Sequence, residues 1–464
     1  MTIEQSLLDH VVPLSYDDLP TDAVDAAKKL LLWTLGTSIA GARDRGAANV
    51  LDVVRELSGG GTGSCTIIGG GHGHPVALAG FANGVSAKAL EFEDKQWIGN
   101  SHAYAVGVAV IPAALAIVEH VGGRTGQQLL TAIAAATDVE MRMISAAPHA
   151  IETSFNSTYV FGTMGAALVA GKLIGLDRDQ LHDALGLATT QAFSTFQGHV
   201  EHSISVRMQM GFCVRNGIYA AIMARSGIGG PRRSLSGRHG LYSAFFGECD
   251  EITALQDVGK VLQGTRLGYK GYPCCAAMHQ AIDALYDAKS RHDVDPDDVE
   301  EVVVHGAPSM AITCQPLAEK QRPVDHVDME FSLPWAIACA LTADALTLDD
   351  FAEEALDDDR RVVLAEKVSA ELDAPDDGVY VEIVTRRGGR LLSEPIGPPL
   401  GHPDNPHDWA SIERCYTDCA RHQPEGPGAT VIDEVRGLVL NMETLEDARR
   451  PVQLLGDRWR TPHV

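Results

Sequence analysis

Hydrophobic residues in the first half of the chain recur with the period of amphipathic helices. Val24, Ala27, Leu31 and Leu35 fall three or four residues apart, which predicts a helix with one apolar stripe. The segment 106–121 is apolar almost all round, and this predicts a helix buried in the middle of a helical domain. Further helical patterns continue to residue 224, so this half of the chain is predicted to be all-α.

Capping residues mark where several of these helices begin and end. Thr21 and Thr125 precede periodic segments and suit the N-cap position, because a threonine hydroxyl accepts a backbone N–H of the first turn. Gly175 follows a small, apolar stretch and suits the C′ position. Asp177 and Gln180 have the spacing of a capping box, which predicts the start of another helix.

The pattern changes after residue 265, where short strands and helices alternate. Residues 302–304 are all valine, and residues 379–384 alternate between two faces, as in strands. Residues 387–390 read Arg-Gly-Gly-Arg and predict a turn, after which Leu391 can start a return strand. From Trp409 the pattern is helical again.

We therefore predict two domains of different class. Residues 1–265 together with 405–464 form a large all-α helical domain, and residues 266–404 form a smaller α+β domain. The chain has 464 residues, which is long enough for two domains of this kind.

Composition and charge narrow the range of partners. The 62 acidic residues outnumber the 37 basic ones and give a net charge of −25, which argues against nucleic acid and against an anionic membrane surface. The longest apolar run, 106–118, contains Pro112 and is too short to cross a bilayer. Residues 1–19 lack the apolar core of a signal peptide, and the nine cysteines suit free thiols, so we expect a cytoplasmic protein.

Two glycine-rich stretches do not match nucleotide-binding motifs. Residues 59–63 and 69–74 lack the lysine that completes a phosphate loop. They also lack the clear strand and helix that flank a dinucleotide-binding turn. We interpret both as plain loops, and no cofactor is expected.

The first group of chemically capable residues lies just before the apolar helix at 106–121. Its members are the acidic run Glu91–Asp94, Gln96 and His102. Helix N-termini favour anions, and a histidine there can take or give a proton near neutral pH. The alternative is a segment that only caps the helix with exposed charges.

The second group surrounds one of the few lysines. Lys270 lies among tyrosine, glycine and proline residues, next to Tyr272 and shortly before His279. A rigid loop of this kind can hold a cation in a fixed direction toward a carboxylate. A nucleophilic Cys274 or Cys275 paired with His279 is an alternative, although cysteine is often only a small buried residue.

Two other groups allow more than one interpretation. Residues 156–158 precede a small, glycine-rich helix and either recognise an anion or simply cap that helix. His199 and His202 are three residues apart and could share a helical face. Because the nearest carboxylate, Glu201, would point elsewhere on a helix, we expect no metal there.

Taken together, these segments resemble the MmgE/PrpD family over most of the chain. Each motif is short, but their order and spacing agree with the family. The matching segments are Leu31–Gly36, Thr66–Gly69, Ala82–Gly84, Leu90–Asp94 with His102, Ile111–Ala116, Arg142 at the end of a helix, Gly162–Leu176, Lys270–Cys275 with His279, Phe331–Pro334 and Gly401–Pro406.

The resemblance implies a large helical domain with a smaller α+β lid domain, in a homodimer. It also implies an enzyme that needs neither metal nor organic cofactor and acts on a small di- or tricarboxylate by dehydration, decarboxylation or epimerisation. Asp94 and His102 match the family's acid–base pair. Lys270 and His279 match residues that the lid domain contributes.

The chain departs from the family's pattern at three positions. Asn156 stands where relatives commonly have a histidine, Val206 where they have a lysine before Arg207, and Trp335 where many have a tyrosine. The loss of one imidazole and one cation predicts a smaller or less charged substrate, or a different reaction on the same scaffold.

We interpret the protein as a cofactor-independent lyase that abstracts a proton next to a carboxylate, like 2-methylcitrate dehydratase or cis-aconitate decarboxylase. The carbanion-like state needs cations and hydrogen-bond donors against the carboxylate oxygens. The predicted catalytic residues are Asp94, His102, Lys270 and His279, and the predicted substrate-binding residues are Gln96, Arg142, Asn156, Thr158, Arg207 and Tyr272.

Three alternatives stay open. The first is an epimerase or isomerase on the same scaffold. The second is a non-catalytic protein that binds carboxylates. The third is a metal-dependent hydrolase that uses His199 and His202.

Overall fold

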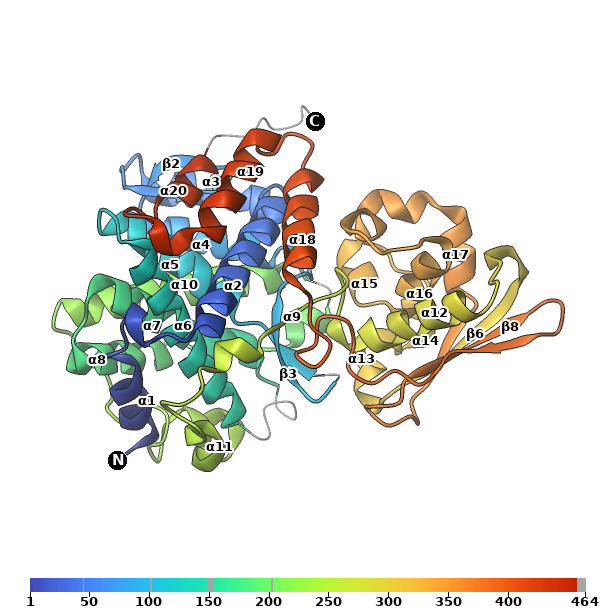
Figure 1. Cartoon of the computed structure of the whole chain (residues 1–464), viewed down its shortest axis with the longest axis horizontal. Helices are drawn as coiled ribbons and strands as arrows, with labels where there is room; N and C mark the ends of the chain where they lie inside the picture. Colours follow the sequence, from blue (N-terminus) through green and yellow to red (C-terminus); the bar gives the residue numbers. More distant parts are fainter. Residues whose placement is uncertain (45, 101, 148–153, 202, 457–464) are drawn as a thin grey trace. The chain divides into compact units, whose positions relative to one another are not determined.

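The structure is a computed structural model of the chain, and it describes all residues except 45, 101, 148–153, 202 and 457–464. The chain forms two compact units (Figure 1). The first consists of Met1–Asp94, Tyr104–Leu267 and Trp409–Val464, and the second of Lys95–Ala103 and Gly268–Asp408. The first is helical and the second contains a mixed sheet, which confirms the predicted fold class.

The predicted domain boundaries are wrong for residues 95–103, which the prediction assigns to the helical domain. In the structure these residues belong to the second unit. The reason is a three-stranded sheet in which β3 (Asp94–Ile98) lies between β4 (His102–Tyr104) and β5 (Gly268–Tyr269). Backbone hydrogen bonds to a strand far along the chain decide the membership of this segment, and no local pattern signals them.

The helical unit is built around α7 (Ser157–Ile174). This helix packs against α5 (Gly107–His120), α6 (Gly126–Ser145), α8 (Arg178–Thr189) and α10 (Ser205–Arg225). By length and composition α7 could cross a membrane, but 89% of its residues are buried inside the unit, as in the core helix of a globular protein. The other helices here are α1 (Ile3–Val11), α2 (Thr21–Gly41), α3 (Ala47–Ser58), α4 (Val76–Lys88), α9 (Gln197–Val200), α11 (Glu251–Leu255), α18 (Trp409–His422), α19 (Ala429–Leu440) and α20 (Arg450–Leu454).

Most of the helix signals in the sequence are confirmed. Every residue of α5 from Gly107 to Glu119 is buried, as its uniformly apolar pattern predicts. Thr125 and Asp177 each form a capping box, and Gly175 ends α7 in the left-handed region with φ 84°. The prediction for Thr21 is wrong, because Pro20 occupies the N-cap position and Thr21 is the first residue of α2.

The C-terminal segment returns to the helical unit, as the pattern after Trp409 predicts. α18 packs along α2, and α19 contacts α2 and α20. Figure 1 shows these helices, in red, beside the blue α2. Gly36 on α2 allows this approach, since a Cβ there would lie 3.1 Å from the Cα of Tyr416.

The second unit has a four-stranded mixed sheet in the order β7-β6-β8-β9. β6 (Val299–His305) runs parallel to β7 (Val368–Glu371) and antiparallel to β8 (Tyr380–Thr385), and β8 forms a hairpin with β9 (Arg390–Leu392). The sequence predicts β6, β8, β9 and the turn between β8 and β9, but it does not predict β7. The helices of this unit are α12 (His279–Arg291), α13 (Ala311–Cys314), α14 (Leu317–Lys320), α15 (His326–Glu330), α16 (Leu333–Thr342) and α17 (Asp359–Ala365).

One glycine-rich stretch is more ordered than the plain-loop interpretation allows. β1 (Cys65–Ile67) and β2 (Gly71–His74) form a short antiparallel hairpin. Its turn contains Gly69 with φ 65°, which glycine adopts without strain.

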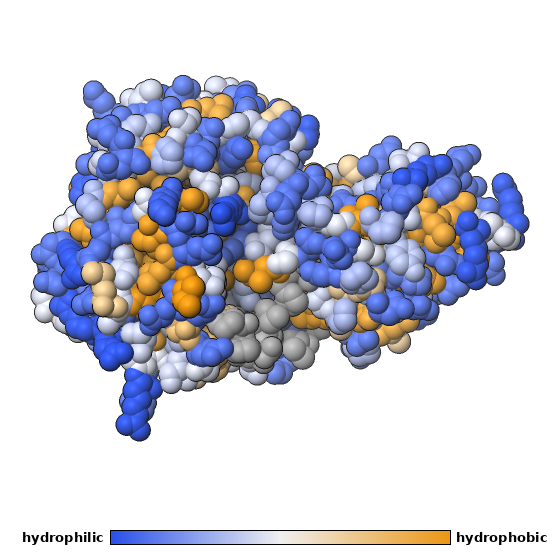
Figure 2. Space-filling model, turned by 60° about the horizontal axis from the view of Figure 1, so that its bottom comes forward, coloured by the Kyte–Doolittle hydropathy of each residue, from blue (hydrophilic) through white to orange (hydrophobic). Residues whose placement is uncertain are grey.

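All nine cysteines are free, as expected. The surface in Figure 2 is mostly hydrophilic with small scattered hydrophobic groups, in keeping with the large excess of acidic residues.

The contact between α7 and α10 leads to a prediction about stability. A Cβ on Gly217 of α10 would lie 2.5 Å from the Cβ of Ala166 and 2.7 Å from the backbone nitrogen of Ala167, both on α7. We expect Gly217→Ala to lower the free energy of unfolding by about 1–3 kcal/mol, because two helix backbones would have to separate. Urea-unfolding midpoints measure this effect.

Gly437→Ala is the matched control. Gly437 also lies inside a helix, α19, but a Cβ there would meet nothing within 4 Å. Alanine should therefore stabilise that helix by about 0.5–1 kcal/mol. Equal midpoints for the two variants would contradict the described packing.

Candidate active site

The carboxylate of Asp94 is held at the N-terminus of α5. Asp94 is fully buried, its Oδ2 accepts the backbone N–H of Val106 at 3.0 Å, and both of its oxygens lie 3.0 Å from the backbone nitrogen of Gly107. A Cβ on Gly107 would lie 2.8 Å from Oδ1, so glycine is what allows this close approach. The N–H groups and the positive end of the helix stabilise a negative charge on Asp94.

His102 is the first residue of β4, which lies next to β3 in the small sheet. Its side chain lies outside the part of the chain that the structure describes. The pairing of His102 with Asp94 therefore stays a prediction.

A buried ion-pair cluster follows α4 and was not predicted from the sequence. The ammonium of Lys88 contacts the carboxylates of Glu91 and Glu93, the latter at 3.2 Å. Burial by itself would lower the pKa of Lys88, but these two carboxylates outweigh it and raise the pKa above its ordinary value. Lys88 therefore stays charged. Because Lys88 balances the negative charge of Glu91 and Glu93 inside the unit, these two carboxylates serve the fold at least in part.

Tyr159 adds a buried hydroxyl near this cluster. It is 1% exposed, and within the described ranges its hydroxyl has no hydrogen-bond partner. Burial raises the pKa of Tyr159 above its ordinary range, so the group is a neutral phenol. A tyrosine on an apolar helix resembles a core residue in the sequence, which explains why it was missed.

The N-terminus of α7 collects the predicted polar groups of residues 156–158. Asn156 is the N-cap, but its side chain does not cap the helix. Thr158 accepts the backbone N–H of Ala105 through Oγ1 at 3.3 Å, and this leaves its own O–H as a donor. All three residues are at least 92% buried. An amide, two hydroxyls and the positive end of an 18-residue helix form a suitable environment for an anion.

Val206 and Arg207 lie in the first turn of α10 and differ in their surroundings. The Nε of Arg207 donates to the carbonyl of Ala89 and lies 3.7 Å from Oδ2 of Asp44. Val206 belongs to an apolar cluster with Tyr159 and Cys213. The family's lysine is thus replaced by an apolar contact, and Arg207 is held by the helical unit itself.

The structure argues against Arg142 as a substrate-binding residue. Its Nε lies 3.0 Å from both oxygens of Asp138. Its two Nη atoms donate to the backbone carbonyls of Ala254, Gln256, Asp257 and Val261 at 2.6–3.5 Å. These contacts hold the guanidinium inside the unit and indicate a structural role for Arg142, while its role in substrate binding stays a prediction.

In the second unit, Tyr272 and His279 lie together. The Tyr272 hydroxyl donates to Oδ1 of Asp283 at 2.5 Å, and the Tyr272 ring lies 5.3 Å from the His279 ring. Burial raises the pKa of Asp283 to about 6, against the opposing effect of its hydrogen bonds. The hydroxyl of Tyr272 is therefore used inside the unit, and its ring positions His279.

The other predicted residues of this unit are also buried. Lys270 and His279 are fully buried, and Gln96 on β3 is 5% exposed. The Nε2 of His279 lies 3.3 Å from the carbonyl oxygen of Cys274, and its ring lies 6.3 Å from the Trp97 ring. The structure thus holds His279 in one orientation at the first residue of α12.

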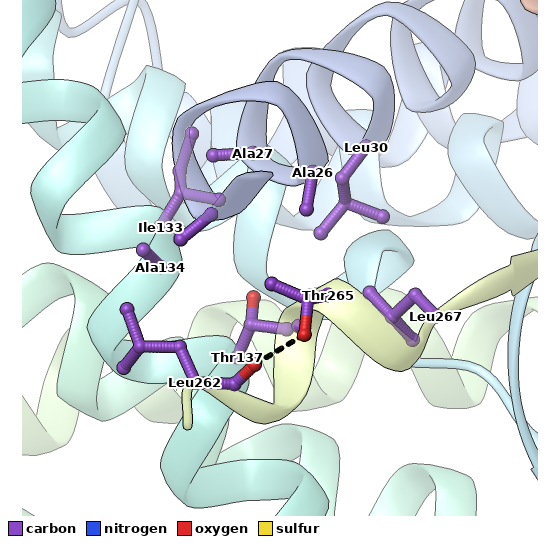
Figure 3. A pocket seen from close by; sticks show the side chains of 11 residues that line it. Ala26, Ala27, Leu30, Ile133, Ala134, Thr137, Leu262, Thr265 and Leu267 are labelled. Atoms are coloured by element: carbon purple, nitrogen blue, oxygen red, sulfur yellow. Dashed lines mark hydrogen bonds between the residues drawn. The ribbon is translucent and has the colours of Figure 1, made fainter. Parts of the chain in front are cut away.

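Two other features do not fit a carboxylate site. The pocket in Figure 3 lies between α2, α6 and the turn Gln263–Arg266 and is lined mainly by alanine and leucine side chains without a cation. The group His305, Glu371 and Asp373 has metal-ligand spacing among the described residues. Contacts of His305 with Glu371 at 3.5 Å and with Asp373 at 3.8 Å explain this grouping without a metal. The other candidate metal pair is His199 with His202, and His202 lies outside the described residues.

Glu140 on α6 is a buried titratable residue that the sequence does not single out. It is fully buried, and neither carboxyl oxygen has a hydrogen-bond partner in the described part of the chain. Burial raises the pKa of Glu140 well above its ordinary value, and the charge of Asp94 raises it further. In the sequence, Glu140 stands between Asp138 and Arg142 and resembles one member of a charged helix face.

Comparison with known proteins shows which family the chain belongs to. The MmgE/PrpD N-terminal domain matches residues 5–251, and the MmgE/PrpD C-terminal domain matches residues 272–434. The chain therefore belongs to the MmgE/PrpD family, which confirms the resemblance noted in the sequence.

Similar proteins extend over nearly the whole chain. A cis-aconitate decarboxylase-like protein, oryM, of Aspergillus oryzae is 25% identical over 98% of this chain and 97% of its own length. A cis-aconitate decarboxylase of Aspergillus terreus is 23% identical over 97% of this chain and 95% of its own. The human cis-aconitate decarboxylase is 23% identical over 80% of this chain and 78% of its own length.

The contacts of Arg142 generate a prediction that separates structure from binding. Arg142→Gln leaves Asp138 without its buried partner, so we expect a loss of about 3–5 kcal/mol in the free energy of unfolding. KM for the substrate should stay the same for the molecules that remain folded. Thermal unfolding and steady-state kinetics measure the two effects.

Arg225→Gln is the matched control, because Arg225 is an exposed arginine near the end of α10. Its effect on stability should stay within about 0.5 kcal/mol. A rise in KM in Arg142→Gln without any loss of stability would restore the binding role.

Proposed function

We propose that this protein is a lyase that decarboxylates a small unsaturated tricarboxylate of the cis-aconitate type. Relatives named cis-aconitate decarboxylase cover nearly the whole chain, which supports this reaction class. The observation that carries the proposal is the buried Asp94 carboxylate, held by the N–H groups of Val106 and Gly107. A fixed anion in a segment that also contains His102 is the arrangement that a proton-transferring histidine requires.

The reaction has one demanding step. The bond between carbon and the departing carboxylate breaks, carbon dioxide leaves, and the electron pair stays on carbon, conjugated with the double bond and a remaining carboxylate. A proton must then reach carbon, so one proton is taken up in each turnover. Donors and cations against the remaining carboxylates stabilise this charge, and a single donor of this type contributes about 3–4 kcal/mol.

We assign these tasks to residues of this chain. Asn156 and Thr158 at the N-terminus of α7 donate hydrogen bonds to a carboxylate, and Arg207 supplies a cation. His102, oriented by Asp94, delivers the proton to carbon. Lys270 and His279 are the contributors that the family resemblance implies for the second unit.

The departures from the family pattern leave fewer groups that can transfer a proton or carry a positive charge. Asn156 can donate a hydrogen bond but cannot carry a proton at neutral pH. Val206 packs among apolar side chains and supplies no charge. Proton transfer therefore rests on His102.

Proton NMR in deuterium oxide tests the reaction class directly. The purified protein is incubated with cis-aconitate, citrate, 2-methylcitrate or iminodisuccinate, with and without a chelator. We expect cis-aconitate to give new vinylic signals of a dicarboxylate with one carbon fewer and one deuterium, together with carbon dioxide. Deuterium exchange without a change of skeleton would indicate an epimerase instead, and loss of turnover with the chelator would indicate a metal enzyme.

The role of His102 is tested by substitution. His102→Asn should lower kcat by about 100-fold to 10,000-fold, because general acid catalysis is lost, while the melting temperature stays the same. His120→Asn is the matched control, because His120 ends α5 and has no proposed role in the reaction. Near-normal turnover in His102→Asn would overturn the assignment.

A further inference from the structure

Glu140 fills a space that glycine residues of α7 leave open. A Cβ on Gly165 would lie 1.7 Å from Oε2 of Glu140, and a Cβ on Gly162 would lie 3.8 Å from Oε1. The same two glycines face Val110 and Ala109 of α5. The carboxyl group is therefore enclosed where α5, α6 and α7 meet, without a donor from the described residues.

Two buried carboxyl groups in one unit thus have opposite surroundings. Asp94 accepts two backbone N–H groups at a helix N-terminus, which favour its charged form. Glu140 has no donor, so its charged form would be both desolvated and unpaired. When two carboxyls repel each other, the one with donors stays ionised and the other keeps its proton.

The neighbours of α6 do not offset a charge on Glu140. His10 of α1 lies 3.6 Å from Asp138, and Lys28 of α2 contacts Glu443 at 2.5 Å, so both pair with other carboxylates. The faces of α5 and α7 present alanine, valine and glycine. From α10, the thiol of Cys213 interacts electrostatically with Glu140, and it is neutral because burial raises its pKa to about 12. Asp94 is the charged group that acts on Glu140.

We propose that Glu140 is a positioning residue for the reaction: its proton keeps Asp94 as the single negative charge of the pair, and its ionisation at alkaline pH turns the site off. This inference rests on the proposed role of Asp94 and His102. A second anion beside Asp94 would draw a proton onto Asp94 or overstabilise the protonated form of His102. In either case the proton could no longer be transferred as the reaction requires.

The sign of the pH effect on stability follows from the same geometry. The pKa of Glu140 is raised in the folded state above the ordinary value of 4.5. The folded state therefore holds a proton that the unfolded state releases, and stability falls as the pH rises from that ordinary value toward the raised pKa. A variant without a titratable group at this position loses this slope.

The experiment compares pH profiles of kcat/KM and of the urea midpoint in wild type, Glu140→Gln and Glu140→Met. Methionine matches the shape without introducing an amide that needs partners, so it serves if the glutamine variant does not fold. We expect the alkaline fall of kcat/KM to move up by roughly one pH unit or more in both variants. We also expect the slope of stability with pH to become shallower.

Glu119→Gln is the matched control, because Glu119 is another buried carboxyl on α5 but is held by the backbone N–H and hydroxyl of Thr66 at 2.6 and 2.7 Å. Its kcat/KM profile should overlay that of wild type. Overlapping activity profiles of wild type and the Glu140 variants would overturn the inference. If wild type converts no carboxylate, the proposed function is overturned instead, and equal stability slopes in wild type and Glu140→Met would then overturn the protonated state of Glu140 as well.

Discussion

The site depends on the contact between the carboxylate of Asp94 and the first N–H groups of α5. Asp94 is the last residue of a stretch of the helical unit, the next nine residues belong to the second unit, and the chain returns at Tyr104 just before α5. The hydrogen bonds from Val106 and Gly107 to Asp94 thus join the two ends of the loop that residues 95–103 form. They fix a charge at the point where the chain passes from one unit to the other. Gly107 is required for this contact, since a side chain there would collide with the carboxylate.

The strongly acidic composition shapes how the remaining charges are used. With 37 basic against 62 acidic residues, cations are scarce, and several buried ones serve the fold. Lys88 is matched by Glu91 and Glu93, and Arg142 is matched by Asp138 and backbone carbonyls. In the proposed site, an anionic substrate is therefore bound by donors that carry no formal charge as well as by cations. We assign the donor role to Asn156 and Thr158 at the N-terminus of α7.

Local signals in the sequence predicted much of the fold, and contacts between distant residues explain what they missed. The capping box at Asp177, the buried α5 and the hairpin of β8 and β9 depend on residues close in sequence, so the pattern reveals them. The partners of Arg142 lie up to 119 residues away, and β3 joins the second unit through β5, so local patterns reveal neither set of contacts. Among the candidate site residues, the position of Asp94 at a helix N-terminus could be predicted because Asp94 precedes an apolar segment. Glu140 could not, because only the packing of α6 against two glycines of α7 removes it from water.

The most direct test of the account is turnover of cis-aconitate by the variant Asp94→Asn. Asparagine keeps the size of the side chain and an oxygen that can accept an N–H of α5, so the protein should still fold, with a loss of about 0.3–1 kcal/mol in the free energy of unfolding. It removes the charge that orients and stabilises a protonated His102. We predict a fall in kcat of at least about 100-fold in the folded variant. Turnover close to that of the wild type would show that the charge at the N-terminus of α5 is not what the chemistry uses, and would contradict the account.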